Sequence, residues 1–442
     1  MKTLSQYALP YALTDGTYVV FCTRNQALIS ISESEYQVLC QHPDDAQALK
    51  EQIRQEVYDA MVQQKMLVDK HEDQDYLAYE VLQNKIASFA NSELSLTIAP
   101  TCDCNFACPY CYEKHKRQSY MSDEVIDQLA DFVEKHEQCK TFSVTWYGGE
   151  PLMAFEQMKK IAKRLSSIKS KKWVGHSIVS NTSLITDEVI DFFRDYKLQS
   201  IQVSIDGTKA HHDLTRRFKC DKSGSFDIIM SNIKKLLLHL PNTKVVVRVN
   251  IDRNTANDFG EIAKYLSENF KNHLNNLSIY PGYIRVEDKE QGCWNCNSVM
   301  HNEQYRFFEN MAKDFAIPVN WIPQKAHKGC GATSLHSFII GPEGDLYKCW
   351  NDFGDKARCV GYLNNTEKKG NQLLLMRYLG MGTGFNDAAC THCAFLPVCD
   401  TGCPWERMAN LYEGKHFNLC TMAKNQDILT NCLSNYVGNL SK

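Results

Sequence analysis

The chain has no uninterrupted apolar stretch long enough to cross a bilayer, and no marked excess of charge of one sign. Its 49 Lys and Arg residues are balanced by 52 Asp and Glu residues, so a formal net charge of −3 gives no reason to expect a nucleic-acid partner. It also lacks the cationic segment and short apolar core of a secretory signal. These absences argue against a membrane protein, and we expect the chain to stay in the cytoplasm.

With 442 residues, 43% apolar and 23% charged, the composition is that of a soluble globular protein of two or three domains. The unusual residue is cysteine, of which there are 19. In a reducing compartment these are not expected to form disulfides, and ten of them fall into two spaced groups, which indicates metal binding. The other nine are interpreted mostly as small buried apolar residues: Cys22, Cys40, Cys102, Cys139, Cys220, Cys293, Cys296, Cys359 and Cys432.

Residues 1–78 read as a small β-then-α domain with a winged-helix shape. Two short apolar runs, 18–22 and 27–31, predict a hairpin, and the pattern turns helical from Ser32 to Val68. Such a domain serves either to bind a peptide or simply to pack or dimerise.

A strand-helix alternation fills residues 90–320 and predicts a parallel sheet with helices outside, here an open six-stranded (β/α)6 barrel of the α/β class. The strand candidates are 94–99, 141–147, 173–180, 200–205, 244–251 and 277–280. In such sheets the site lies at the carboxyl ends of the strands. Residues 326–430 lose this periodicity and become rich in cysteine, so we expect a third domain folded around metal.

The first cysteine group, Cys104, Cys108 and Cys111, follows the first of these strands in a C-x₃-C-x₂-C spacing. Three thiolates on a cubane cluster leave one iron without a protein ligand, which opens a position for a substrate or cofactor. A zinc site or an electron-transfer cluster would want a fourth thiolate close by, and Cys102 is poorly spaced for that role.

This motif, with the aromatic Tyr110 before the third cysteine, resembles that of radical S-adenosylmethionine (SAM) enzymes. The resemblance implies that SAM chelates the open iron and is cleaved to a 5′-deoxyadenosyl radical that abstracts a hydrogen atom.

Further residues at strand ends resemble the SAM contacts of that family. The second strand ends in the GGE motif Gly148, Gly149 and Glu150, where glycines permit close approach to a ligand and the carboxylate can accept from an ammonium. For single polar residues at strand ends, a helix cap or an Asx turn is an equally good interpretation. Where relatives often carry Asn-Gly, this chain has Asn181 followed by Thr182, which leaves the ribose contact open. The other candidates are Ser180, Asn181, Ser204, Asp206 and Arg216, with Arg248 and Asn250 as weaker ones.

The second cysteine group resembles the seven-cysteine pattern of SPASM domains, which hold two auxiliary [4Fe–4S] clusters, making three in all. By that resemblance the outer cluster would be bound by Cys390, Cys393, Cys399 and Cys420, and the inner one by Cys330, Cys349 and Cys403. The fourth inner ligand stays open, with Cys293, Cys296 or a substrate thiolate as candidates. A four-thiolate zinc site is the alternative for the Cys-x₂-Cys stretch.

The whole combination resembles radical SAM/SPASM maturases of ribosomally made peptides, whose N-terminal module binds the leader of a precursor peptide by strand addition. The resemblance implies a cross-link in the core peptide, a thioether where cysteine takes part, and a flavodoxin- or ferredoxin-type reductant.

The second reading is an anaerobic sulfatase maturase that forms formylglycine. Such relatives tend to carry Asp directly after the cysteine that matches Cys349, whereas here Trp350 follows and Asp352 lies farther on. A third reading is a cluster-bearing redox or scaffold protein without radical chemistry. Tyr280, Tyr283, Trp350 and Asp352 are candidates for the residue that quenches or deprotonates the radical intermediate.

Overall fold

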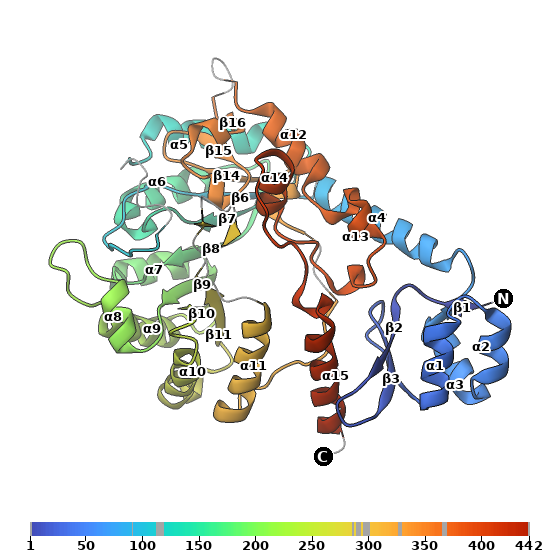
Figure 1. The fold of residues 1–442 in the computed structure, drawn as a ribbon. Coiled ribbons are helices and arrows are strands. Elements are labelled where there is room, and N and C mark those ends of the chain that lie inside the picture. Colours follow the sequence, from blue (N-terminus) through green and yellow to red (C-terminus); the bar gives the residue numbers. More distant parts are fainter. Residues whose placement is uncertain are drawn as a thin grey trace.

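The computed structural model describes residues 2–90, 92–111, 119–284, 287–288, 293–294, 301–325, 329–364 and 369–440 (Figure 1). In this part of the chain no helix is both long enough and apolar enough to span a bilayer.

The N-terminal region forms a three-stranded antiparallel sheet in the order β2-β3-β4, covered on one face by three helices. Its apolar core joins strand residues such as Val20 and Ile31 to helix residues such as Leu39, Leu49 and Met61. The elements are β1 (Thr3–Leu4), β2 (Ala8–Ala12), β3 (Tyr18–Cys22), β4 (Leu28–Ile31), α1 (Glu33–Gln41), α2 (Ala46–Gln52), α3 (Gln55–Gln63) and β5 (Leu67–Val68). The predicted hairpin is β3-β4, and β2 adds a strand that the pattern did not indicate.

The long helix α4 (Glu72–Phe89) connects this region to the central sheet, which has nine strands in the order β11-β10-β9-β8-β7-β6-β14-β15-β16. All six predicted strands are present as parallel neighbours. They are β6 (Glu93–Ile98), β7 (Thr141–Trp146), β8 (Lys172–Ser180), β9 (Leu198–Ile205), β10 (Lys244–Ile251) and β11 (Leu277–Tyr283). The α/β fold with a mostly parallel sheet is therefore as predicted.

The helices between these strands pack along one side of the curved sheet (Figure 1). Helix α5, for example, starts where the Ser122 side chain accepts a hydrogen bond from Val125 N, and it buries Ile126, Leu129 and Val133 one turn apart against the sheet. The remaining helices are α6 (Phe155–Ser166), α7 (Asp187–Asp195), α8 (Lys209–Thr215), α9 (Phe226–His239), α10 (Asp258–Asn269) and α11 (His301–Phe315), and a short pair, β12 (Glu287–Asp288) and β13 (Cys293–Trp294), follows β11.

The cysteine-rich C-terminal region continues the same sheet. Strand β14 pairs in parallel with β6, and β15 and β16 follow it antiparallel. Ile340, Leu346 and Tyr378 of this region share the large apolar core of the barrel. The elements are β14 (Ser337–Ile340), β15 (Asp345–Tyr347), β16 (Gly361–Tyr362), α12 (Gln372–Met381), α13 (Ala388–Thr391), α14 (Pro404–Tyr412) and α15 (Gln426–Leu440).

The second face of the N-terminal sheet packs on the C-terminal helix α15 (Figure 1). Tyr11 and Phe21 from the sheet meet Ile428, Leu429 and Leu433 from the helix in one buried cluster. The sheet is thus sandwiched between its own helices and α15, which places the N-terminal region beside the C-terminal region.

Candidate active site

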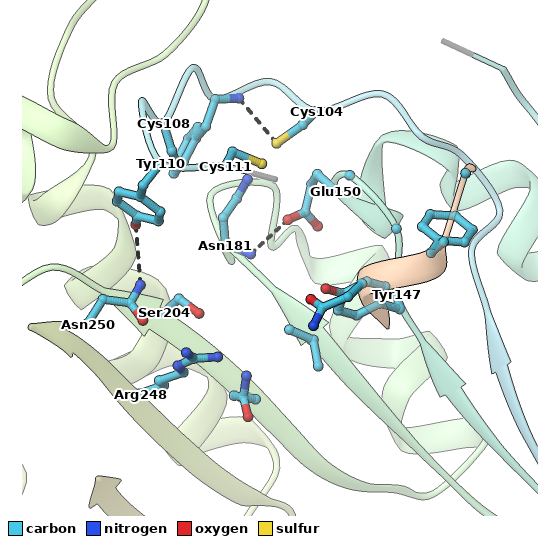
Figure 2. A pocket seen from close by; sticks show the side chains of 18 of the residues that line it. Cys104, Cys108, Tyr110, Cys111, Tyr147, Glu150, Asn181, Ser204, Arg248 and Asn250 are labelled. Atoms are coloured by element: carbon cyan, nitrogen blue, oxygen red, sulfur yellow. Dashed lines mark hydrogen bonds between the residues drawn. The ribbon is translucent and has the colours of Figure 1, made fainter. Parts of the chain in front are cut away.

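A cavity of about 1110 Å³ opens at the carboxyl ends of the parallel strands (Figure 2). Its wall is shared between the barrel and the C-terminal region, which contributes Phe353, Trp405 and Cys403. Among the predicted site residues, those that line the cavity are Cys104, Cys108, Tyr110, Cys111, Gly148, Gly149, Glu150, Ser180, Asn181, Ser204, Arg216, Arg248, Asn250 and Cys403.

The three cysteines after β6 lie together at one side of this cavity (Figure 2). Cys104 Sγ accepts a hydrogen bond from Phe106 N at 3.4 Å, and burial, with the Glu150 carboxylate nearby, raises the pKa of the Cys104 thiol to about 12. Cys102 does not line the cavity and packs on the apolar cluster of Ala99 and Tyr347. Among the described residues no group of three His, Cys, Asp or Glu is arranged around a single ion, whereas a cubane cluster takes its thiolates at separate irons.

The two glycines of the GGE motif lie against the cysteine loop. Their missing side chains make room for that loop and not for a ligand. Gly148 has φ +120°, and a Cβ there would lie 2.2 Å from Thr101 O. A Cβ on Gly149 would lie 2.1 Å from Asp103 O, so any side chain at either position would displace the loop that carries Cys104. The structural role of these glycines is therefore to let two loops touch.

Glu150 is almost fully buried, and both carboxylate oxygens accept hydrogen bonds. Oε1 accepts from Ser180 Oγ at 2.8 Å and from Leu152 N at 3.1 Å, and Oε2 accepts from Asn181 N at 2.7 Å. Burial raises the pKa of the carboxyl above its ordinary value, although these hydrogen bonds and Arg216 act in the opposite sense. No Lys or Arg ion pair to Glu150 exists among the described residues, so a ligand ammonium fits this anion.

One hydrogen-bond network joins four of the candidate residues, Tyr110, Asp206, Arg216 and Asn250. The Tyr110 hydroxyl donates to Asp206 Oδ2 at 2.6 Å, Arg216 Nη1 donates to the Tyr110 hydroxyl at 3.1 Å, and Asn250 Nδ2 donates to Asp206 Oδ1 at 3.0 Å. Asp206 is buried behind this network and does not line the cavity. Asn250, a weaker candidate in the sequence, is thereby tied to the residue that precedes Cys111.

The end of β8 is linked to the cysteine loop through Asn181, whose Nδ2 donates to Asn105 Oδ1 at 2.8 Å. Thr182, where relatives often carry glycine, has φ +59°, in the left-handed region that favours glycine. Its carbonyl is held by Asn232 Nδ2 at 2.7 Å. Thr182 therefore holds a backbone conformation that favours glycine, at the cost of some strain.

The C-terminal cysteines gather in the two predicted groups. Burial raises the pKa of Cys349, and Asp352, Cys403 and Cys330 lie close enough to raise it further. The candidate ligand Cys296 and the side chain of Cys293 lie outside the described residues.

In the outer group, Cys420, Cys393 and Cys390 raise the pKa of Lys424, and Cys399 interacts with Cys390. Of all seven C-terminal cysteines only Cys403 reaches the cavity wall. The inner group is thus the one that faces the barrel.

The four candidates for a radical-quenching or acid-base residue differ in their contacts and in whether they line the cavity. Asp352 is fully buried, accepts hydrogen bonds from Tyr378 OH at 2.7 Å and Trp405 Nε1 at 3.0 Å, and does not line the cavity. Trp350 packs on Tyr147 with ring centroids 3.8 Å apart. Tyr280 donates to Gln202 Oε1 at 2.8 Å, and of the four only Tyr283 lines the cavity.

Comparison with known proteins identifies the barrel. The model of the radical SAM superfamily matches residues 98–266. The chain is 24% identical over 363 residues to the serine-type anaerobic sulfatase-maturating enzyme of Bacteroides thetaiotaomicron, covering 71% of this chain and 82% of that one. It is 26% identical over 171 residues to the sporulation killing factor maturation protein SkfB of Bacillus subtilis, covering 39% of each.

The fold is also similar to the solved structure of native anSMEcpe with bound AdoMet and Kp18Cys peptide, with a TM-score of 0.60 and 20% identity, covering 79% of this chain and 99% of that one. The superfamily implies a [4Fe–4S] cluster and SAM, and the cysteine triplet and the unpaired Glu150 anion suit both. We conclude that residues 98–266 of this chain form a radical SAM domain and that the chain is an enzyme.

Proposed function

We propose that the protein is a peptide maturase that binds the leader of a ribosomally made precursor and installs a thioether between a core cysteine and a neighbouring carbon. Bound at Cys104, Cys108 and Cys111, the cluster with SAM would supply a 5′-deoxyadenosyl radical. The peptide would lose one hydrogen atom to that radical and one proton from the thiol, and an auxiliary cluster would accept the one electron released when the carbon–sulfur bond closes. The proposal requires a place for a leader and a place for a thiol.

The N-terminal sheet offers the place for a leader at the outer edge of β4. In an antiparallel sheet, residues alternate between bonding their neighbour and pointing their backbone outward. Because Cys22 N bonds Ala27 O, the pair of Phe21 with Leu28 and that of Val19 with Ser30 do not exchange bonds, so Leu28 and Ser30 direct their backbone groups outward. No hydrogen bond to these outward groups is found among the described residues.

The opposite edge, β2, is less suited to strand addition. There Thr23 N bonds Tyr7 O, which by the same alternation turns Ala8, Pro10 and Ala12 outward. Pro10 has no N–H, and Ala8 N is already bonded to Ser5 O, so this edge has few donors left. An added strand would therefore pair with β4.

The open β4 edge is the observation that carries the proposal. The similarity to anSMEcpe covers 99% of that chain but only 79% of this one. The extra length here is consistent with a function that anSMEcpe does not have. A leader held at β4 would raise the local concentration of the core peptide at the cavity.

Cys403 supports the second requirement, because it lines the same cavity as the first cysteine group. We propose that Cys330, Cys349 and Cys403 hold an inner auxiliary cluster and that Cys390, Cys393, Cys399 and Cys420 hold an outer one. An open inner position at the cavity wall would let a core cysteine approach as a thiolate. A flavodoxin- or ferredoxin-type protein would be the reductant.

The second candidate, formylglycine formation, is favoured by the similarity to a sulfatase-maturating enzyme. Against it, Asp352 forms an ion pair with Arg358, accepts hydrogen bonds from Tyr378 and Trp405, and is absent from the cavity wall, so it is not placed to take a proton from a substrate. We therefore place this function second.

The product decides between the two. The anaerobically reconstituted chain is incubated with SAM, dithionite and cysteine-containing peptides taken from the small reading frames that neighbour its gene, and each peptide is examined by mass spectrometry. A maturase product keeps its sulfur and loses a pair of hydrogens, whereas formylglycine formation removes the sulfur. Cys104→Ala should abolish 5′-deoxyadenosine formation, while Cys349→Ala should leave uncoupled formation intact and stop the product. Unchanged product from Cys349→Ala would rule out the auxiliary role.

A further inference from the structure

Arg248 lies inside the barrel, one step below the network that contacts the cysteine loop. On β10 it pairs in register with Ser204 of β9 and Tyr280 of β11. Asn250, two residues closer to the mouth, bonds Tyr110 at 3.2 Å, so the backbone of Arg248 is deeper by about 7 Å along the strand, and its side chain extends toward the mouth. Figure 2 shows Arg248 near Ser204, on the side of the cavity away from the cysteines.

This guanidinium lines the cavity without an ion pair to any described carboxylate. Its Nε is buried and has no hydrogen-bond partner among the described residues. The other cations of the wall are committed, since Arg216 bonds Tyr110 and Lys356 bonds Asp345 at 3.0 Å. A cation in a partly desolvated cavity is costly unless an anion meets it.

The backbone around Arg248 is shaped to hold it. Gly282 on β11 lies beside Asn250 in the register, and a Cβ there would lie 2.2 Å from Arg248 Nε. A glycine on the neighbouring strand thus leaves the space through which the side chain reaches the cavity. The Tyr280 hydroxyl is occupied by Gln202, so it does not compete for the guanidinium.

The geometry points to Arg248 as a specificity-determining residue that binds a carboxylate of the substrate peptide, from an Asp or Glu side chain or from a free C-terminus. The inference rests on the proposed peptide-maturase function. SAM also carries a carboxylate, but the SAM-binding candidates Glu150 and Arg216 contact Asn181 and Tyr110 beside the cysteine loop, and Arg248 has no hydrogen bond to either group among the described residues. The cavity of about 1110 Å³ leaves room for a peptide side chain as well as SAM.

The test compares end-capped synthetic peptides that contain one cysteine and differ at one residue, Asp, Glu, Asn or Lys, with the Asn peptide also made with a free C-terminal carboxylate. Their dissociation constants are measured anaerobically on the reconstituted enzyme with SAM bound. We expect a carboxylate-bearing peptide to bind about tenfold or more tightly than the capped Asn peptide, since one charge-assisted bidentate contact has that effect. The peptides that bind more tightly show whether the carboxylate comes from a side chain or from the C-terminus.

Arg248→Gln should abolish this preference, Arg248→Lys should retain part of it, and Arg248→Glu should favour the Lys peptide. Arg253→Gln, which removes a cation paired with Glu303 outside the cavity, is the matched control and should keep the preference. Equal binding of charged and neutral peptides by the unmodified enzyme, including no binding at millimolar concentration, would overturn the inference. So would a loss of SAM affinity in Arg248→Gln that matches the loss of peptide affinity. Absence of 5′-deoxyadenosine from the unmodified enzyme would instead refute the proposed function.

Discussion

At the scale of single residues, Glu150 is the side chain on which SAM recognition should most depend, because it is a buried anion whose hydrogen bonds within the described chain come from neutral donors. Glu150→Gln keeps the shape and removes the charge. We expect it to weaken SAM binding about tenfold or more, as for loss of a charge-assisted hydrogen bond. Equilibrium binding of SAM to the reconstituted protein measures this.

The same carboxyl predicts a pH dependence. Its pKa is raised by burial, so it takes up a proton earlier on acidification than an exposed Glu. SAM affinity should then fall as the pH is lowered through this pKa, and the Glu150→Gln variant should lose that part of the profile. An identical pH profile in both proteins would contradict the assigned contact.

The chemistry-bearing residues were predictable from the sequence where type and spacing alone fix the role, as for Cys104 and Glu150. The reason for the glycines was not, because the atoms that Gly148 and Gly149 make room for belong to a loop some 45 residues earlier. That Arg248 Nε has no partner in the described part of the chain could not be predicted either, because it depends on which side chains the fold brings near it.

At the scale of elements, the outer edge of β4 yields a sharp test. Ser30→Pro removes one outward N–H while leaving the bonds to β3 in place, because Ser30 does not bond β3. Loss of one hydrogen bond of about 1 kcal/mol should weaken leader binding about fivefold. The measurement is leader affinity of the full chain, with Ser30→Val as a control that keeps the N–H. Equal leader affinity of the two variants would exclude this edge.

The six parallel strands were predictable because each is a run of alternating or apolar residues followed by a helical period. Strand β2 escaped because Pro10 reads as a strand breaker, although an edge position tolerates it. Strand β14 escaped for another reason. It is four residues long, and its partner β6 lies some 240 residues earlier, so no local pattern announces the pairing.

At the scale of the whole molecule, the packing of the N-terminal sheet on α15 should couple leader binding to the cavity. Leu429 is fully buried in that interface. Leu429→Ala should cost about 2–5 kcal/mol of stability there and increase hydrogen exchange in β3 and α15. SAM cleavage without peptide should be unaffected, while product formation falls. Leu440→Ala, at an exposed site on the same helix, should behave like the unmodified protein. Unaltered exchange in β3 would show that the interface does not hold the domain.

The parallel pairing of β14 with β6 also constrains how this enzyme can diversify. Strand β6 leads directly into the first cysteine loop, and β15, the partner of β14, leads to Cys349. Backbone hydrogen bonds therefore hold the first cysteine loop and the segment that carries Cys349 at a fixed separation. New substrates would have to be accommodated by changes in the residues that line the cavity, and not by moving one of these two segments relative to the other.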